Sequence, residues 1–337
     1  MKRDEKNIEA RGAANVHQES SAAVTVKQQV KTAAGAVNGQ QTKVMVPETN
    51  TQQVTRAAAA NGQRKVSAAA VRVRKTAVVI GASGGIGESV ATAFFKKGYN
   101  VVCGYHFNQM AAEALADRLM AARAGKMNRA AAGGDVMSER VGKMNRAAAV
   151  GVDVTDEQSV AAFFDAVAKT FGCVDVLVNA GGVSRPNLLI DVKKEDICAE
   201  VGTNLVGVML TCREAAKIMM RFGGGRIINI ASVWGVVGAA VESTYSGAKA
   251  GVIGFSRALS KELGGANITV NCISPGAVKT AMTAHLSKAD FDAIKRESPI
   301  EKMVTPKAIA QTAVFLAGSA GEFITGQNIV VDCGWTA

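Results

Sequence analysis

The sequence predicts an α/β fold built as one doubly wound domain, with a seven-stranded parallel sheet flanked by helices. Residues 76–337 alternate short β-branched runs with longer amphipathic stretches, the pattern of parallel strands joined by helices on both faces. All 16 aromatic residues follow residue 75, so only this part of the chain can build a large core. A glycine-rich turn directly follows the first run, as in sheets of this kind that bind phosphates.

Seven runs are short, apolar and bounded by glycine or polar residues, which is typical of buried strands. In chain order they are AVVI (77–80), NVVCG (100–104), AAAVGV (147–152), VDVLVN (174–179), RIINIA (226–231), ITVNCI (268–273) and NIVV (328–331). Apolar residues at three- and four-residue spacing predict helices between them, at 85–97, 109–120, 156–170, 203–221, 243–263 and 306–317. Ligands of such sheets bind beyond the carboxyl ends of the strands, so residues directly after each strand are the candidates for chemistry.

Residues 1–75 have a different composition from the rest of the chain. They hold 13 Lys and Arg against 5 Asp and Glu, which gives +8 of the formal charge of +11 and leaves +3 for residues 76–337. Without aromatics they have little with which to build a core, so we interpret them as a basic, disordered extension. Acids at Asp4, Glu5 and Glu9 disfavour organelle import, and we expect a cytoplasmic protein, with import through residues 1–75 as the minor alternative.

Several classes of function are disfavoured by composition. No run approaches the ~18 apolar residues that a membrane-spanning helix needs. The six Cys and three His show no metal-ligand spacing, so neither a membrane nor a metal is expected. The extension has no aromatic to stack on bases, which disfavours nucleic acid as a partner.

One octapeptide, GKMNRAAA, occurs at 125–132 and again at 142–149. Removing one copy would leave a helix, a short loop and a strand of ordinary length. We therefore interpret the duplication as a surface insertion near 125–146.

The turn after the first strand reads GASGGIG and opens the first helix. Its glycines permit a tight turn and let the backbone approach a pyrophosphate, toward which the amides of the helix N-terminus point. The pattern predicts a dinucleotide site, with contacts from Gly81, Ser83, Gly85, Ile86 and Gly87.

Further motifs follow the later strands in a fixed order. They are Asn179-Ala180-Gly181 after the fourth strand, Asn204 early in the next helix, Ser232 after the fifth strand, Tyr245 and Lys249 on the following helix, and Pro275-Gly276 after the sixth strand. With these motifs, residues 76–337 apart from the insertion resemble the short-chain dehydrogenase/reductase family. The resemblance implies a Rossmann-type domain and an NAD(P)-dependent oxidoreductase.

Tyr245 and Lys249 are four residues apart, so on a helix they share one face. A lysine ammonium there is expected to lower the pKa of the phenol, and Tyr245 can then act as the acid that protonates a carbonyl oxygen. Ser232 would hold the same oxygen by a hydrogen bond. The family resemblance implies that Lys249 also binds the nicotinamide ribose and that Asn204 supports a proton-relay water.

The resemblance also implies a set of cofactor contacts beyond the glycine turn. These are Asp153, Val154, Asn179, Ala180, Gly181, Tyr245, Lys249, Pro275, Gly276 and Val278. For Asp153, the competing interpretation is a residue at the start of the following helix.

NADP(H) is the favoured cofactor, because no Asp or Glu follows the second strand to bind a ribose 2′-hydroxyl and repel a 2′-phosphate. Two departures from the family pattern leave NAD(H) open. Ile80 stands where the family has Thr, and Gly84 stands where NADP-selective reductases often have Arg.

Within the family, residues 226–232, 245–255 and 323–327 resemble 3-oxoacyl-acyl-carrier-protein reductases most. The resemblance implies reduction of a 3-oxoacyl thioester on acyl carrier protein to the 3-hydroxyacyl form in fatty acid biosynthesis, by a homotetramer. Candidate contacts for this acidic carrier are the basic residues Arg213, Lys217, Arg221 and Lys261. A solvated helix face is the alternative interpretation of these cations.

Two other functions are weighed against this one. Trp234, Glu242 and Trp335 resemble reductases of a 5-aminopentanone group on elongation factor P, where a carboxylate could bind the substrate ammonium. A non-catalytic scaffold or nucleic-acid-binding protein that uses the basic extension is the alternative from a different class. The complete set of Ser232, Asn204, Tyr245 and Lys249 argues against this last alternative.

Overall fold

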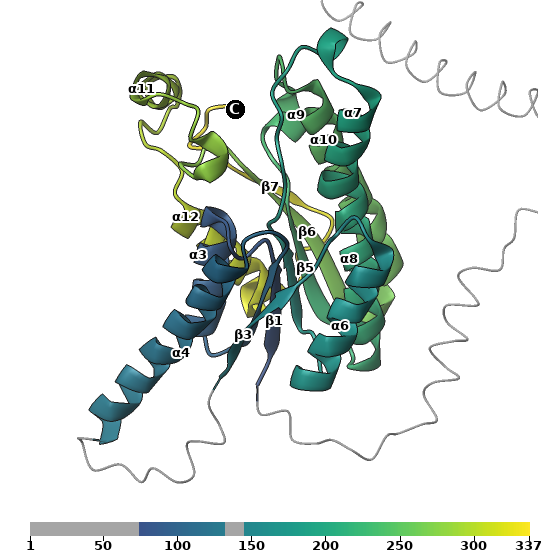
Figure 1. Ribbon diagram of the computed structural model, residues 1–337, viewed down its shortest axis with the longest axis vertical. Coiled ribbons are helices and arrows are strands. Elements are labelled where there is room, and N and C mark those ends of the chain that lie inside the picture. The colour runs from purple at the N-terminus through teal and green to yellow at the C-terminus, as the bar shows by residue number, and fades with distance from the viewer. Residues whose placement is uncertain (1–73, 132–144) are drawn as a thin grey trace, which may run out of the picture. The chain divides into compact units, whose positions relative to one another are not determined.

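The computed structural model describes residues 74–131 and 145–337, which contain a seven-stranded parallel sheet covered by helices on both faces (Figure 1). The strand order is β3-β2-β1-β4-β5-β6-β7. The strands are β1 (Thr76–Ile80), β2 (Asn100–Tyr105), β3 (Ala147–Gly151), β4 (Val176–Asn179), β5 (Gly225–Ile230), β6 (Ile268–Pro275) and β7 (Asn328–Val331). The fold class predicted from the sequence is confirmed.

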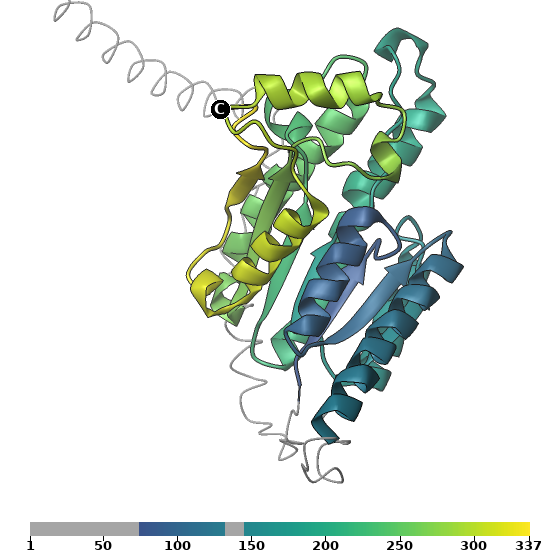
Figure 2. The ribbon, with the colours of Figure 1, turned by 90° about the vertical axis from the view of Figure 1, so that its left-hand side faces the viewer.

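Two groups of helices cover the sheet. One face carries α3 (Gly85–Lys96), α4 (Gln109–Ala131) and α12 (Pro306–Ala317), which Figure 2 shows in front of the strands. The other face carries α6 (Glu157–Phe171), α8 (Gly207–Arg221) and α10 (Ser243–Leu263). In β1, Val79 faces the first group and Val78 the second, as the period of a strand requires.

The strand order reverses direction at β1, which pairs with β2 on one side and with β4 on the other. Ile80 is in register with Gly104 of β2 and with Asn179 of β4. β1 is therefore the point where the strand order switches direction, and doubly wound sheets bind ligands beyond the carboxyl ends of the strands at such a point.

The helix predicted at 203–221 is longer and interrupted. It begins as α7 (Lys194–Val201), passes through a π-helical turn (Gly202–Val206) and continues as α8. The short α9 (Trp234–Val237) and the polar α11 (Lys288–Glu297) had no predicted counterpart. In Figure 1 both helices lie beyond the carboxyl ends of the strands.

The two copies of the repeated octapeptide differ in structure. Residues 125–131 of the first copy belong to α4, whereas Ala147 to Ala149 of the second copy form most of β3. Residues 132–144, and the predicted extension up to residue 73, lie outside the described part of the chain. Within the part described, no helix has the length and apolar content to cross a bilayer.

Candidate active site

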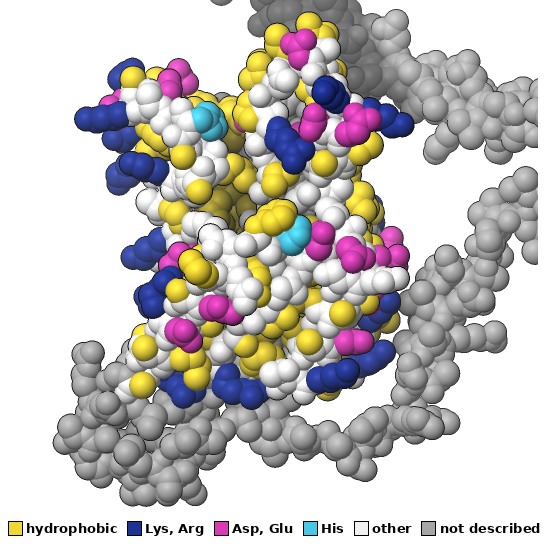
Figure 3. All heavy atoms as spheres, in the orientation of Figure 1, with side chains coloured by type: hydrophobic (Ala, Val, Ile, Leu, Met, Phe, Trp, Pro, Cys, Tyr) yellow, Lys and Arg dark blue, Asp and Glu magenta, His cyan; other side chains and the backbone are white. Residues whose placement is uncertain are grey.

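Ser232, Tyr245 and Lys249 line one cavity of about 260 Å³ at the carboxyl end of the sheet. Ser232 follows β5, and the other two lie one turn apart on α10. All three side chains are buried. Figure 3 shows a hollow with hydrophobic side chains between the part of the molecule that carries α11 and the part that carries α9.

Tyr245 is held in its protonated form. Burial raises the pKa of Tyr245 to about 12, a hydrogen bond with Ser232 acts in the opposite direction, and the carboxylates of Glu242 and Glu200 raise the pKa further. This differs from the expectation that the nearby lysine lowers the pKa. The reason is that burial is the largest influence on this pKa, and Lys249, whose Nζ donates to the carbonyl oxygen of Ile230 at 2.9 Å, does not offset it.

Lys249 shares the burial of Tyr245 and responds in the opposite sense. Removing an ammonium from water disfavours its charged form, and burial lowers the pKa of Lys249 to about 8. Both residues are thus pushed toward their neutral forms, which leaves the phenolic proton on Tyr245 at neutral pH. A protonated phenol can donate to a carbonyl oxygen that gains negative charge.

Asn204 holds the loop that follows β4. Its side chain is fully buried in the π-helical turn, accepts from the Val183 amide at 3.0 Å and donates to the Val183 carbonyl at 2.7 Å. A Cβ on the adjacent Gly182 would lie 2.8 Å from Asn204 Oδ1 and 3.4 Å from Lys249 Nζ. Asn204 and Lys249 therefore approach the same point of the loop, where a larger residue would require the Asn204 side chain to shift.

Two carboxylates hold the next two residues of this loop. Glu200, buried and one turn before Asn204, accepts from the amide of Arg185 at 3.1 Å, and Glu242 accepts from Ser184 Oγ at 3.2 Å. Burial raises the pKa of Glu200, and the amide of Arg185 opposes this. The role of Glu200 was not predicted from the sequence. Its spacing of four residues from Asn204 is the one signal that could have placed it on the same side of the helix.

The glycine turn has the shape that a pyrophosphate requires. Gly81 has φ +77°, and its amide donates to the carbonyl of Gly104 at 2.9 Å. A Cβ on Gly87 would lie 2.1 Å from the Gly81 oxygen. Gly85, Ile86 and Gly87 are the first residues of α3, whose amides have no partner within a helix. Backbone this close, with free amides at a helix N-terminus, fits a dinucleotide phosphate.

The side chain of Asn179 is used inside the domain. It donates to Asn229 Oδ1 at 2.9 Å and accepts from Thr211 Oγ1 at 2.9 Å. Its contribution to a cofactor site would thus be to fix the end of β4, from which Ala180 and Gly181 enter the cavity.

Asp153 and Val154, which the family resemblance implies as cofactor contacts, directly follow β3. Asp153 accepts from the Thr155 hydroxyl at 2.7 Å, which lowers the pKa of Asp153. The residue that caps α6 is Asp156, so the competing interpretation of Asp153 as a helix-start residue is not supported.

The structure brings about half of the predicted site residues into the one cavity. Those that line it are Ile86, Ala180, Gly181, Ser232, Tyr245, Lys249, Pro275, Gly276 and Val278. The residues that lie outside its lining are Gly81, Ser83, Gly85, Gly87, Asp153, Val154, Asn179 and Asn204.

Comparison with protein families supports this geometry. A family model described as enoyl-(acyl carrier protein) reductase matches residues 126–336, and one described as short chain dehydrogenase matches residues 75–143. The chain belongs to the short-chain dehydrogenase/reductase family. As a member with this site, it is an NAD(P)-dependent oxidoreductase.

The match to individual members of the family extends over nearly the whole length of each relative. The 3-oxoacyl-[acyl-carrier-protein] reductase FabG of Chlamydia muridarum is 35% identical over 78% of this chain and 97% of its own. Carbonyl reductase family member 4 of Danio rerio is 36% identical over 77% and 97%. A solved short chain dehydrogenase from Burkholderia cenocepacia, in complex with NADP, matches with a TM-score of 0.68 at 28% identity, over 79% of this chain and all of its own.

Two of the candidate carrier contacts on α8 form ion pairs. Arg213 Nε lies 2.8 Å from Glu214 Oε1, and Arg213 Nη2 lies 2.7 Å from Glu157 Oε1 of α6. Lys217 Nζ lies 2.8 Å from Glu214 Oε1. Their charges are largely compensated, which favours the alternative of a solvated helix face for these two.

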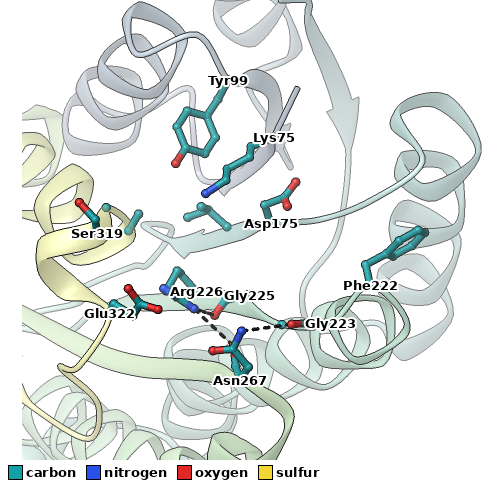
Figure 4. A pocket seen from close by; sticks show the side chains of 14 residues that line it. Lys75, Tyr99, Asp175, Phe222, Gly223, Gly225, Arg226, Asn267, Ser319 and Glu322 are labelled. Atoms are coloured by element: carbon teal, nitrogen blue, oxygen red, sulfur yellow. Dashed lines mark hydrogen bonds between the residues drawn. The ribbon is translucent and has the colours of Figure 1, made fainter. Parts of the chain in front are cut away.

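A larger cavity of about 330 Å³ lies at the opposite, amino end of the strands (Figure 4). Its charges are mixed, with Lys75 and Arg226 beside Asp175 and Glu322. Arg226 donates to the carbonyls of Gly225 and Asn267, so it serves the local backbone. This cavity contains none of the motifs of the family. In the described ranges, no three His, Cys, Asp or Glu residues gather as a metal site would require.

Proposed function

We propose that the chain is an NADP(H)-dependent reductase that converts the 3-oxo group of an acyl thioester on acyl carrier protein to the 3-hydroxy group, in fatty acid biosynthesis. The observation that carries the proposal is one cavity lined by Ser232, Tyr245 and Lys249. Ile86 of the glycine-rich turn lines the same cavity. Identity of 34–36% to reductases of that name over 97–99% of their length supports the substrate class.

The reaction adds hydride to the carbonyl carbon and a proton to its oxygen, which yields a secondary alcohol. When bound, the reduced dinucleotide supplies the hydride. Tyr245 donates its phenolic proton to the oxygen, while Ser232 stabilises the charge that develops there by a hydrogen bond. As the family resemblance implies, Asn204 would support a water that relays a proton to Tyr245. Lys249, whose Nζ approaches Gly182 beside Asn204, would bind the nicotinamide ribose.

The choice of NADP(H) rests on the end of β2. Tyr105 is followed by His106, Phe107 and Asn108, so no carboxylate there would repel a 2′-phosphate. The NADP complex of the Burkholderia cenocepacia relative supports the same choice.

The proposal includes a homotetramer, as the family resemblance implies, and a cytoplasmic location, which the acids Asp4, Glu5 and Glu9 favour. Sedimentation equilibrium would give four times the monomer mass of 34.8 kDa; a monomer would contradict it.

A second candidate substrate is the 5-aminopentanone group on elongation factor P. It is favoured by Glu242, which lines the cavity and could bind an ammonium group. A neutral residue at this position would bind such a group less strongly.

Initial rates of NADPH oxidation distinguish the two substrates. Acetoacetyl-acyl carrier protein should be reduced with a kcat/KM at least about tenfold above that of elongation factor P carrying the aminopentanone group. The reverse order would assign the second function. Replacing NADPH by NADH tests the cofactor, and we expect a lower kcat/KM with NADH.

A further inference from the structure

The two tryptophans of the chain contact each other at the candidate active site. Trp234 begins α9, and Trp335 lies near the C-terminal end, which Figure 1 places between α11 and α9. Their ring centres are 5.1 Å apart with an interplanar angle of 59°. Both rings line the cavity that contains Ser232 and Tyr245.

Trp234 is placed by the catalytic serine itself. Its amide donates to Ser232 Oγ at 3.2 Å. A Cβ on the next residue, Gly235, would lie 2.7 Å from the Lys249 carbonyl carbon, so α9 packs directly on the backbone of α10. The indole of Trp234 therefore starts two residues from the group that holds the reacting oxygen.

Trp335 is held by a turn built around Asp332. This buried carboxylate accepts from the Gly334 amide at 2.9 Å and from the Thr336 amide and hydroxyl at 2.8 and 2.7 Å. Cys333 and Gly334 have φ values of +64° and +82°, which turn the chain toward the cavity side. Trp335 Nε1 donates to Glu297 Oε2 of α11 at 3.1 Å, which fixes the ring against that helix.

The surroundings of the pair are mainly apolar. Met282, Leu286 and Ile294 line the same cavity, although Thr280, Thr283 and His285 of that segment add polar groups to the lining. An aromatic pair offers a large, rigid apolar surface with little rotamer freedom to lose. Such a surface suits the part of a substrate that does not react.

We propose that Trp234 and Trp335 form the binding wall for the alkyl chain of the 3-oxoacyl substrate, and that the Trp335 ring limits the length of chain the site accepts. The inference rests on the proposed function for its substrate class. Methylenes buried against this wall should each raise kcat/KM about fourfold until the chain reaches Trp335.

The test measures kcat/KM for ethyl 3-oxo esters of four to twelve carbons with NADPH, beside the matching carrier thioesters. In Trp335→Ala the ratio of the twelve-carbon to the four-carbon value should rise at least about tenfold over wild type. Trp335→Phe, which keeps a ring, should stay within about threefold. Phe323→Ala, a change at an exposed ring outside the cavity, is the matched control and should leave the ratio unchanged. An unchanged ratio in folded Trp335→Ala would overturn the inference.

A binding measurement is independent of turnover. Because both tryptophans of the chain line the cavity, ethyl 3-hydroxyhexanoate, a short-chain product analogue, should change the intrinsic tryptophan fluorescence saturably without dinucleotide, in wild type and in Trp335→Phe. If neither protein shows a saturable change, the proposed binding wall is contradicted. Should Trp335→Ala fail to fold, this binding measurement tests the proposal in its place. If wild type reduces the ethyl esters and not the carrier thioesters, the result counts against the proposed function. The rates with the esters and the fluorescence titration would still test the binding wall.

Discussion

Tyr245 and Lys249 show how one physical cause can act on two neighbouring residues in opposite directions. Burial penalises charge, so it raises the pKa of the phenol to about 12 and lowers the pKa of the ammonium to about 8. The pair therefore favours a protonated Tyr245 at neutral pH, which is the form required to complete reduction of a ketone. The order of the two residues on the helix was evident from the sequence, but their burial was not.

Tyr245→Phe removes the proton donor and little else, because the ring remains. We expect kcat to fall about 10³-fold, in the range for loss of a general acid. Dinucleotide affinity, measured by fluorescence titration, should change by less than about threefold. A variant that retained more than a tenth of wild-type kcat would show that another group donates the proton.

Lys249 makes stability depend on pH. Its pKa in the folded protein, about 8, is below the ordinary value of 10.5, so between these pH values the unfolded chain binds more protons and stability rises with pH. Relative to Lys249→Met, wild type should gain about 2 kcal/mol in free energy of unfolding between pH 7 and pH 9.5. Urea unfolding of both proteins at the two pH values measures this. A difference between the proteins that does not vary with pH would be inconsistent with a lowered lysine pKa.

At the scale of elements, the loop after β4 is held by side chains from distant parts of the chain. Val183, Ser184 and Arg185 are each held by a different polar side chain, from Asn204, Glu242 and Glu200. Gly182 and Ser184 of this loop line the candidate active-site cavity. A shift of the loop should therefore be felt at the reacting atoms.

Glu200 offers a direct check on this dependence. Glu200→Gln keeps an oxygen that can accept from the Arg185 amide, whereas Glu200→Leu removes this acceptor. We expect kcat/KM to fall about tenfold in the Leu variant and to stay within about threefold in the Gln variant. Equal losses in the two variants would indicate that the charge, rather than the hydrogen bond, is what matters.

The sequence predicted the elements that have strong patterns and missed those that do not. The seven strands were predicted because buried parallel strands read as continuous apolar runs. The glycine-rich turn was predicted because its glycines stand between the first strand and the first helix. The short α9 and the polar α11 lack such a pattern. The π-helical turn at Gly202–Val206 also left no signal, and the burial of Glu200 went against the usual exposure of carboxylates.

Contacts between distant parts of the sequence lay beyond prediction for a different reason. Trp234 and Trp335 were each noticed, but their contact depends on how the turn around Asp332 folds onto the end of β6. A Cβ on Gly276, after β6, would lie 2.9 Å from the Asp332 Cβ. Such close approach is a product of the tertiary fold and has no local pattern.

At the scale of the whole molecule, the repeated octapeptide illustrates the dominance of context. Ala130 and Ala131 of the first copy belong to α4, whereas the equivalent Ala147 and Ala148 of the second copy belong to β3. In the second copy, Asn145 Nδ2 donates to the carbonyls of Phe95 and Tyr99. Packing against β2 decides the conformation of the second copy, since the local sequence is identical.

This predicts that one copy is dispensable. Deletion of residues 125–141 joins Ala124 to the second copy and keeps Asn145 and β3. We expect kcat/KM to remain within about threefold of wild type and the Tm to change by less than about 4 °C, equivalent to roughly 1 kcal/mol or less. Loss of the cooperative thermal transition would mean that the insertion is part of the folded core.

The central claim, that the molecule is an NADP(H)-dependent reductase of carrier-bound 3-oxoacyl groups, is tested most directly by the mass of its product. Purified full-length protein is incubated with acetoacetyl-acyl carrier protein and NADPH, and the intact carrier is then weighed by mass spectrometry. The account predicts a gain of two hydrogens per carrier, matched mole for mole by NADPH consumed, and no gain with Tyr245→Phe over the same time. An unchanged carrier mass with folded wild-type protein would contradict it.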